Sequence, residues 1–340
     1  MVYDNVLEAM GHTPLIRLRH IPDENCAQIL VKFEALNVGG SIKTRTAYNM
    51  ILQAERRGEI APGKTTIIEP TSGNQGIGLA LVGAVRGYDV RIIMPDSVSV
   101  ERRKICEAYG AQIELVHDDG DIGKAIATCA ELACEQTAAD PNAFMPDQFS
   151  NVDNVAIQRA QTAVEILDDA NESGIVIDGF ACGFGTGGSI TGIGSALKLA
   201  NPDTIVWAAE PENAAMLAGG NIGTHLQMGI GDGVIPAILD RSVIDATCVV
   251  SDDEAITMAQ RLAREEGLLC GISSGTNVVA AMMLGYELGP DATVVTVLTD
   301  TGERYFSTPL FGGVEGRFDY SRSSFSANST SSTSQNSSRY

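Results

Sequence analysis

The segment TTIIEPTSGNQGIGLALVGAV, residues 65–85, decides the fold of this chain. It opens with an apolar run at residues 65–70, passes through a turn rich in Gly, Ser, Thr and Asn, and ends in a helix-like stretch at residues 76–85. The first run is apolar on both faces, which is typical of a parallel strand covered by helices. The segment therefore predicts a strand, a turn and a helix, the unit from which α/β sheets are built.

The same unit recurs on both sides of residue 150. We predict further strands at residues 29–34, 90–95, 112–116, 175–183, 205–211 and 293–298, and helices at residues 44–57, 100–109, 122–136, 190–199 and 252–266. Two such sets predict an α/β fold with two doubly wound domains and mostly parallel sheets, at residues 1–150 and 151–312. Serine makes up half of residues 321–340, so we predict a Ser-rich disordered tail at residues 313–340.

The net charge and the composition of the chain exclude some classes of binding partner. The formal net charge of −20 at pH 7 repels nucleic-acid phosphates and anionic lipid headgroups, so we expect neither nucleic acid nor membrane as a partner. The acidity itself is most simply a source of solubility. No apolar run approaches the roughly 20 residues of a membrane span, and the N-terminus lacks a basic region followed by an apolar one. We therefore expect a cytoplasmic protein that acts on a small molecule.

The seven cysteines and four histidines form no metal-binding or disulfide pattern. The cysteines are odd in number and contain no CxxC pair, and the histidines stand apart. Several cysteines lie inside apolar runs, which predicts buried side chains rather than a catalytic thiol. We expect no metal site.

A lysine follows a Gly-Gly-Ser turn in the segment NVGGSIKTR, residues 37–45. Lys43 stands at the predicted start of a helix, where the positive end of the helix dipole disfavours an ammonium ion and lowers the lysine pKa. This position favours imine chemistry. Taken alone, however, the segment would be interpreted as a solvated surface lysine.

Two turns between predicted strands and helices have compositions suited to anions. EPTSGNQGIG, residues 69–78, offers backbone N–H groups with hydroxyl and amide side chains, which suits a carboxylate, although an ordinary N-capped turn has the same composition. CGFGTGGSITGIG, residues 182–194, lets backbone amides approach a phosphate. It also contains G-x-G-x-x-G, but no convincing ribose-binding acid follows, so a single phosphate fits better than a dinucleotide.

Taken in order, the motifs of this chain resemble those of one enzyme family. They are GHTPLIRL at residues 11–18, the lysine segment, EPTSGNQGIGLA at 69–80, GTGGSITG at 185–192, GISSGT at 271–276 and GERYFSTPLF at 302–311. They resemble the cysteine synthase family of fold-type-II pyridoxal 5'-phosphate (PLP) enzymes, which includes O-acetylserine sulfhydrylase and cystathionine β-synthase. The resemblance covers about residues 3–312 and implies a tryptophan synthase β-subunit-like fold, PLP as cofactor and a homodimer.

The resemblance implies a role for each matching residue. Lys43 would carry the Schiff base, Asn74 would hydrogen-bond the ring hydroxyl oxygen, and Ser273 would face the pyridine nitrogen. The cofactor phosphate would bind Gly185, Thr186, Gly187, Gly188 and Ser189. The α-carboxylate of the substrate would bind Thr71, Ser72, Asn74 and Gln75, together with Gln148.

These roles imply chemistry at the β-carbon of a serine- or cysteine-like amino acid. A neutral serine at the ring nitrogen does not stabilise a protonated ring as a carboxylate would, so PLP withdraws electrons less strongly. This favours loss of a β-leaving group over transamination. Lys43, freed when the substrate amine replaces it, is the natural base for the α-proton. The resemblance thus implies β-elimination and β-replacement through an aminoacrylate, as in the synthesis of cysteine from O-acetylserine and sulfide.

Three positions depart from the family pattern. The chain has Thr44-Arg45 where the family has Asp-Arg, Gln75 where it has Thr, and Asp232 where it has a small neutral residue. A carboxylate at Asp232 would orient the substrate amine, or activate a water that converts L-cysteine to L-serine (or, with a thiol, allow lanthionine) with release of hydrogen sulfide. The alternative is that Asp232 caps a turn beside glycines.

Two functions from other classes stay open at this point. A nicotinamide-dependent oxidoreductase would use the Gly-rich loop for its cofactor. A non-catalytic relative would bind the end of a partner peptide in the cleft, but the presence of Lys43, Asn74 and Ser273 argues against this function.

Overall fold

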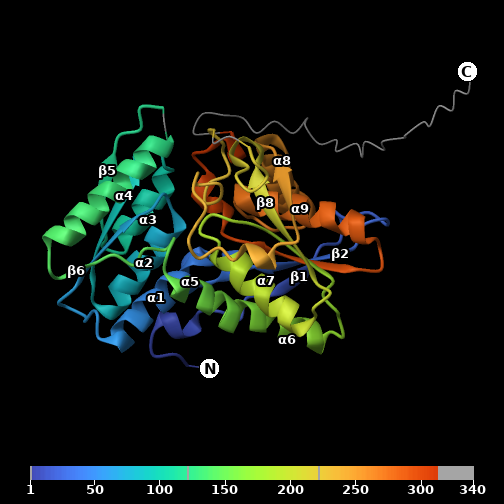
Figure 1. Cartoon of the computed structure of the whole chain (residues 1–340), viewed down its shortest axis with the longest axis horizontal. Helices are drawn as coiled ribbons and strands as arrows, with labels where there is room; N and C mark the ends of the chain where they lie inside the picture. Colours follow the sequence, from blue (N-terminus) through green and yellow to red (C-terminus); the bar gives the residue numbers. More distant parts are fainter. Residues whose placement is uncertain (1, 121, 221–222, 313–340) are drawn as a thin grey trace, which may run out of the picture.

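The computed structural model describes residues 2–120, 122–220 and 223–312. Within them the strands form a four-stranded and a six-stranded sheet, which lie side by side with helices around each (Figure 1). The tail predicted at residues 313–340 lies outside the described residues. The predicted α/β class with mostly parallel sheets is confirmed.

The four-stranded sheet is parallel throughout, in the order β5-β4-β3-β6. Ile67 and Ile92 pack in a cluster with residues of helices α1 and α2, whereas Ile68 and Ile93 pack against helix α4. The central strands β3 and β4 are therefore covered on both faces, which is why both of their faces carry apolar residues. The elements are β3 (Thr66–Pro70), α2 (Asn74–Arg86), β4 (Asp89–Pro95), α3 (Val100–Ala108), β5 (Gln112–Val116), α4 (Ile122–Ala139) and β6 (Ala143–Phe144).

The six-stranded sheet has the order β1-β2-β10-β7-β8-β9, and only the edge strand β1 runs antiparallel to its neighbour. Its strands are β1 (Leu15–Arg17), β2 (Gln28–Phe33), β7 (Gly179–Gly183), β8 (Ile205–Pro211), β9 (Ala246–Val250) and β10 (Thr293–Leu298). The remaining helices are α1 (Lys43–Arg57), α5 (Val152–Ile157), α6 (Ala163–Glu172), α7 (Gly188–Ala200), α8 (Asp252–Glu265) and α9 (Ile272–Leu288). A π-helical turn, Gln158–Thr162, joins α5 to α6.

Short helical turns connect several of these elements. They are η1 (Val6–Ala9), η2 (Glu34–Leu36), η3 (Val38–Gly40), η5 (Glu212–Ala214), η6 (Arg241–Val243), η7 (Gly302–Tyr305) and η8 (Pro309–Phe311). The turns η2 and η3 lie directly before α1, and η7 follows the carboxyl end of β10.

The structure contains elements that the sequence did not predict. Helices α5 and α6 and strands β1, β6 and β9 were not expected. Strands β1 and β6 and helix α5 are too short to show a clear apolar period, whereas α6 has buried residues at helical spacing, Ala163, Ile166 and Ala170, that were overlooked in the sequence. Strands β1 and β2 pair with the six-stranded sheet, so the strands of residues 1–150 are divided between both sheets. The division into two domains at residue 150 stays a prediction.

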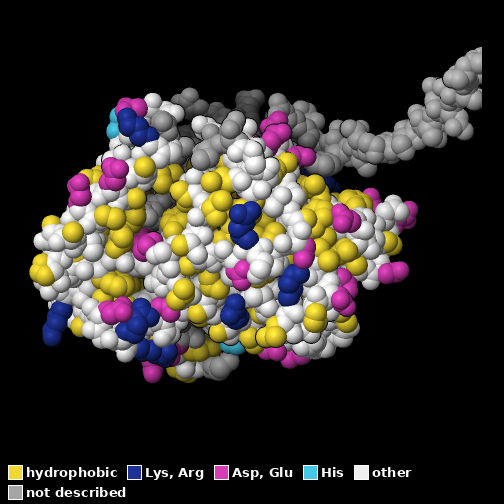
Figure 2. All heavy atoms as spheres, in the orientation of Figure 1, with side chains coloured by type: hydrophobic (Ala, Val, Ile, Leu, Met, Phe, Trp, Pro, Cys, Tyr) yellow, Lys and Arg dark blue, Asp and Glu magenta, His cyan; other side chains and the backbone are white. Residues whose placement is uncertain are grey.

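The surface agrees with the acidic composition. On the face shown in Figure 2, Lys and Arg side chains stand singly or in small groups among acidic ones, and this face has no continuous basic surface. In the described ranges, no helix has both the length and the apolar character that crossing a membrane requires.

A buried ionic network joins β2, η2, α1 and α6. Arg45 donates to both carboxylate oxygens of Glu34, at 2.9 and 2.7 Å, and to both of Glu165, at 2.6 and 2.8 Å. The Lys32 ammonium lies 2.9 Å from Glu165 and donates to the Thr13 carbonyl at 2.5 Å. Lys32, Glu34 and Arg45 are fully buried, so each of these charges depends on its partners within the network.

We predict that Glu165→Gln destabilises the fold by about 3 kcal/mol at pH 7, because Lys32 and Arg45 then lose a buried counter-charge. Burial alone would raise the pKa of Glu165, but Arg45 and Lys32 outweigh it and lower the pKa to about 2. The carboxylate therefore stabilises the fold fully above its ordinary pKa of 4.5, and this contribution is lost as the pH falls towards 2.

Urea unfolding of both proteins between pH 7 and pH 3 measures this effect. The difference between them should shrink below pH 4.5, and the exposed Glu135→Gln variant should show none. A difference that does not change with pH would contradict the ionic origin of the stabilisation.

Candidate active site

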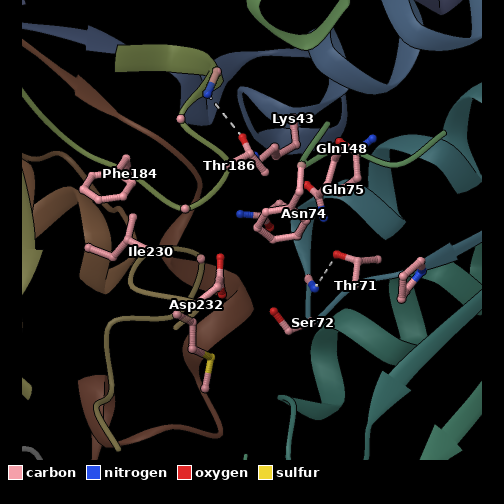
Figure 3. A pocket seen from close by; sticks show the side chains of 18 of the residues that line it. Lys43, Thr71, Ser72, Asn74, Gln75, Gln148, Phe184, Thr186, Ile230 and Asp232 are labelled. Atoms are coloured by element: carbon pink, nitrogen blue, oxygen red, sulfur yellow. Dashed lines mark hydrogen bonds between the residues drawn. The ribbon is translucent and has the colours of Figure 1, made fainter. Parts of the chain in front are cut away.

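A cavity of about 360 Å³ lies between the two sheets, a volume suited to a small ligand. Its walls come from the β3–α2 loop, the start of α1, the β7–α7 loop, the 228–232 segment and the start of α9. Several of these segments follow the carboxyl ends of parallel strands, where ligands bind in α/β sheets. Figure 3 shows that Lys43, Thr71, Asn74, Gln148, Thr186 and Asp232 surround one common space.

Lys43 is the first residue of α1 and points into this cavity. Gly39 and Gly40 before it have φ of 73° and 70°, a left-handed turn that directs the chain into the helix. The Nζ atom of Lys43 lies 3.5 Å from Thr186 Oγ1. Burial lowers the pKa of Lys43, and interactions with Asp232, Cys182 and Glu69 oppose this shift only in part. A neutral amine at this position can act as nucleophile and base.

The 71–75 loop leaves β3 and leads into α2, which begins at Asn74. Thr71 Oγ1 accepts a hydrogen bond from Gly73 N at 3.3 Å. Gln75 is 1% exposed, and neither its amide nitrogen nor its amide oxygen has a hydrogen-bond partner among the described residues. Buried amides normally have partners, so Gln75 together with Thr71 and Ser72 forms a wall that can accept a polar ligand.

Gln148 faces this loop from the segment after β6, and Glu69 fixes its backbone. The Glu69 carboxylate accepts from Asp147 N at 3.0 Å and from Gln148 N at 3.1 Å. Burial raises the pKa of Glu69 to about 8, although these two backbone hydrogen bonds lower it. The carbonyl of Gln148 accepts from Asn154 Nδ2 at 2.9 Å.

The 183–189 loop connects β7 to α7 and places backbone amides at the start of that helix. Gly187 has φ of 81°, a conformation that favours glycine. A Cβ atom at Gly188 would lie 2.1 Å from Asn154 Oδ1, and one at Gly185 would lie 2.4 Å from Gly229 O. Thr186 Oγ1 accepts from Asn154 Nδ2 at 3.0 Å. Only glycines fit at these two positions, and the N-terminus of α7 favours an anion.

Asn74 and Ser273 line the cavity, and both side chains contact residues of the segment after β10. Asn74 Nδ2 donates to Asp300 Oδ2 at 2.8 Å, and Asn74 Oδ1 accepts from Arg304. The hydroxyl groups of Ser273 and Thr299 lie 3.0 Å apart. Asn74 therefore keeps one amide hydrogen free for a ligand, and Ser273 presents a neutral hydroxyl.

Asp232 lies on the six-stranded-sheet side of the cavity, across from Thr71 (Figure 3). Its carboxylate would lie 2.8 Å from a Cβ atom placed on Gly185, so it touches the 183–189 loop. Burial raises the pKa of Asp232, while Lys43 and His225 oppose the shift. Asp232 thus belongs to the cavity and is more than a surface turn residue.

The structure brings every predicted site residue to this cavity. Lys43, Thr71, Ser72, Asn74, Gln75, Gln148, Gly185, Thr186, Gly187, Gly188, Ser189, Asp232 and Ser273 all line it. Sequence analysis missed Glu69, Arg102 and Thr299 as lining residues, and Asn154 as the residue that joins the 183–189 loop to Gln148. Glu69 opens the 69–78 turn but was given no role there, and the other three stand in no turn of unusual composition, so no local signal marked them. Within the described ranges, no His, Cys, Asp and Glu side chains cluster as a metal site.

The chain matches the family model for pyridoxal-phosphate dependent enzymes over residues 6–300. It belongs to this family. A cysteine synthase of Staphylococcus aureus is 44% identical over 308 residues, which cover 91% of this chain and 97% of that protein. The predicted family, enzyme class and cofactor are thereby confirmed, and a nicotinamide-dependent oxidoreductase has no support.

Solved structures of related enzymes share the fold. O-ureido-L-serine synthase has a TM-score of 0.84 and 41% identity, covering 94% of this chain and 98% of that one. A hydrogen sulfide-producing enzyme from Fusobacterium nucleatum has a TM-score of 0.84 and 38% identity, covering 89% of this chain and 100% of that one.

The residues of the cavity fit PLP. The glycine loop at the start of α7 suits its phosphate, because Gly185 and Gly188 leave room that a side chain would fill. Lys43, with its lowered pKa, stands beside Thr186 of that loop. Ser273 and Asn74 supply the polar groups that a substituted pyridine ring requires.

We predict that Gly185→Ala weakens PLP binding about 10-fold or more, because the new methyl group would displace the Gly229 carbonyl and the Asp232 carboxylate. Equilibrium dialysis of the cofactor-free protein against PLP measures the affinity. Gly194→Ala, in the helix that follows the loop, is the control, since its Cβ would meet Val243 at 2.8 Å and Val206 at 3.3 Å, neither of which lines the cavity. Equal affinity in both variants would contradict this assignment of the loop.

Proposed function

We propose that this enzyme carries out β-replacement on serine- or cysteine-type amino acids, with the synthesis of cysteine from O-acetylserine and sulfide as its reaction. One observation supports the proposal: a single cavity is lined by a lysine of lowered pKa, by a glycine loop at the start of a helix and by the Gln75 amide, which has no hydrogen-bond partner among the described residues. The S. aureus relative, which is named a cysteine synthase, supports this reaction over others of the family.

Each group of cavity residues has its own role in the proposed reaction. PLP, when bound, withdraws electrons from the α-carbon of the amino acid. Lys43 Nζ accepts the α-proton, because its lowered pKa keeps a fraction of the amine neutral. The 71–75 loop and Gln148 hold the substrate carboxylate and orient the Cα–H bond towards Lys43. If Ser273 faces the ring nitrogen, as the resemblance implies, its neutral hydroxyl would give that nitrogen no carboxylate partner, which would favour loss of a β-substituent.

Asp232 supports a second reaction at the same site. Its carboxylate is buried beside the 183–189 loop and faces the substrate space, and burial raises its pKa. A carboxylate there can take a proton from water as the water adds to the β-carbon, so L-cysteine would yield L-serine and hydrogen sulfide, and a thiol in place of water would yield lanthionine. The structural similarity to a hydrogen sulfide-producing enzyme supports this second reaction.

We further propose that the enzyme is a cytoplasmic homodimer whose partners are its amino-acid substrate and sulfide, water or a thiol. All seven cysteines are free and six of them are buried, which suits a reducing compartment. The dimer rests on the resemblance to a family whose members are commonly dimeric.

We predict that Lys43→Ala abolishes cysteine formation and the visible absorbance of the lysine-bound cofactor, because the described residues place no other amine in the cavity at this position. Turnover of O-acetylserine with sulfide and an absorbance spectrum of the purified protein measure the two effects. The exposed Lys64→Ala variant should behave as wild type. Retention of the absorbance band in Lys43→Ala would refute the role of Lys43.

We predict that Asp232→Asn loses serine formation from L-cysteine at least about 10-fold while it keeps synthesis from O-acetylserine and sulfide, because sulfide needs no base. In the wild type, serine formation should rise as the pH increases through the raised pKa of Asp232, since only the carboxylate accepts a proton. Chromatography of serine and cysteine measures both reactions, with the exposed Asp203→Asn as control. Unchanged serine formation in Asp232→Asn would rule out the base.

A further inference from the structure

Arg102 is a buried arginine that reaches the cavity from α3. It is 2% exposed and lines the wall beside the 71–75 loop. A Cβ atom placed on Gly73 would lie 3.1 Å from its Nε and 3.4 Å from its Cζ. The guanidinium is therefore in contact with the loop that faces the substrate.

The guanidinium has no oxygen acceptor within hydrogen-bond distance among the described residues. Its Nε has no partner, and its Nη1 donates to the thioether sulfur of Met228 at 2.6 Å, a weak acceptor. Its Nη2 lies 4.0 Å from Asp300 Oδ2, and its Cζ lies 4.7 Å from the centre of the Tyr305 ring. An arginine carries five N–H donors, and leaving them unpaired in the interior is costly.

The nearest carboxylate is Asp300, whose Oδ1 has no hydrogen-bond partner among the described residues and whose Oδ2 is already engaged by other groups. It accepts from Asn74 Nδ2 and from the Tyr305 hydroxyl, each at 2.8 Å. Arg304, which is 3% exposed, lies in the same cluster and donates to Asn74 and to the carbonyl of Gly39. Two buried cations, Arg102 and Arg304, thus share one buried anion, and the wall next to Gly73 carries an excess positive charge.

We propose that Arg102 binds an oxyanion of the amino-acid substrate and thereby selects for substrates that carry one at this position. The inference rests on the proposed function, since it assigns a group of that substrate to a residue of the same cavity. The contact with Gly73 places the guanidinium beside the substrate's α-carboxylate, whereas its contact with Met228 places it near the segment of Asp232 and the β-substituent. The oxyanion that binds Arg102 is therefore either the α-carboxylate or a negatively charged β-substituent of the substrate.

Calorimetric binding to the PLP-loaded enzyme tests the proposal with three probes. L-Serine carries the α-carboxylate, L-serinamide lacks it, and O-phospho-L-serine adds a charged β-substituent. If the oxyanion is the α-carboxylate, Arg102→Met should lower the affinity for L-serine about 10-fold or more and leave the affinity for L-serinamide unchanged. A loss of that size confined to O-phospho-L-serine would identify the β-substituent instead.

Two further variants separate ligand binding from a structural role. Arg103→Met makes the same change at the next position of α3, which does not line the cavity, and should bind all three probes as wild type does. Arg102→Lys retains the charge and should recover part of the lost affinity for the probe that Arg102→Met weakens.

The proposal is overturned if Arg102→Met binds all three probes unchanged or weakens all three equally. The second result is expected if Arg102 serves only to hold α3 against Asp300 and Tyr305. Failure of the proposed function gives a different result, because wild-type enzyme would then not bind L-serine and would not convert O-acetylserine and sulfide to cysteine.

Discussion

The pairing of Arg45 with Glu34 and Glu165 is the interaction on which the site depends. Arg45 stands two residues after Lys43, and its four hydrogen bonds to these carboxylates join the first turn of α1 to η2 and α6. Because the network is buried, its geometry is held by partners on several elements at once. The position of the Lys43 amine relative to the α7 loop follows from this anchoring.

The cavity itself concentrates titratable groups, two carboxyl groups and an amine, whose pKa values are shifted towards their neutral forms. Burial raises the pKa of Glu69 and Asp232 and lowers that of Lys43, and each of these groups reduces the shift of another. Such mutual perturbation is common at sites that move protons. Arg102 adds a cation with no oxygen acceptor within hydrogen-bond distance among the described residues, and it shares Asp300 with Arg304, so the wall beside Gly73 differs in charge from the Lys43 side.

Sequence analysis predicted much of the fold because its strongest signals are local. The apolar strands β3, β4, β5, β8 and β10 and the glycine-rich turns after β3 and β7 are visible within windows of about ten residues. The short strand β1 and the six-residue helix α5 were missed because each is too short to show a period, and the helical spacing of buried residues in α6 was overlooked. The pairing of β2 with β10 joins segments more than 250 residues apart, which no local pattern reports.

The sequence by itself determined the α/β class, the PLP family and the positions of the lysine and of two loops that we predict to bind anions, because each depends on residue types at fixed spacing. Only the tertiary structure decided which residues share the cavity and what their charge states favour. The Glu69 carboxylate accepts a hydrogen bond from the backbone of Gln148, and Asn154 donates to both Gln148 and Thr186. The guanidinium of Arg102 has no oxygen acceptor within hydrogen-bond distance among the described residues. These environments depend on segments that are distant in the sequence. The reason is physical: burial and the neighbouring charges set a side chain's pKa and its need for a ligand, and both arise only when the chain is folded.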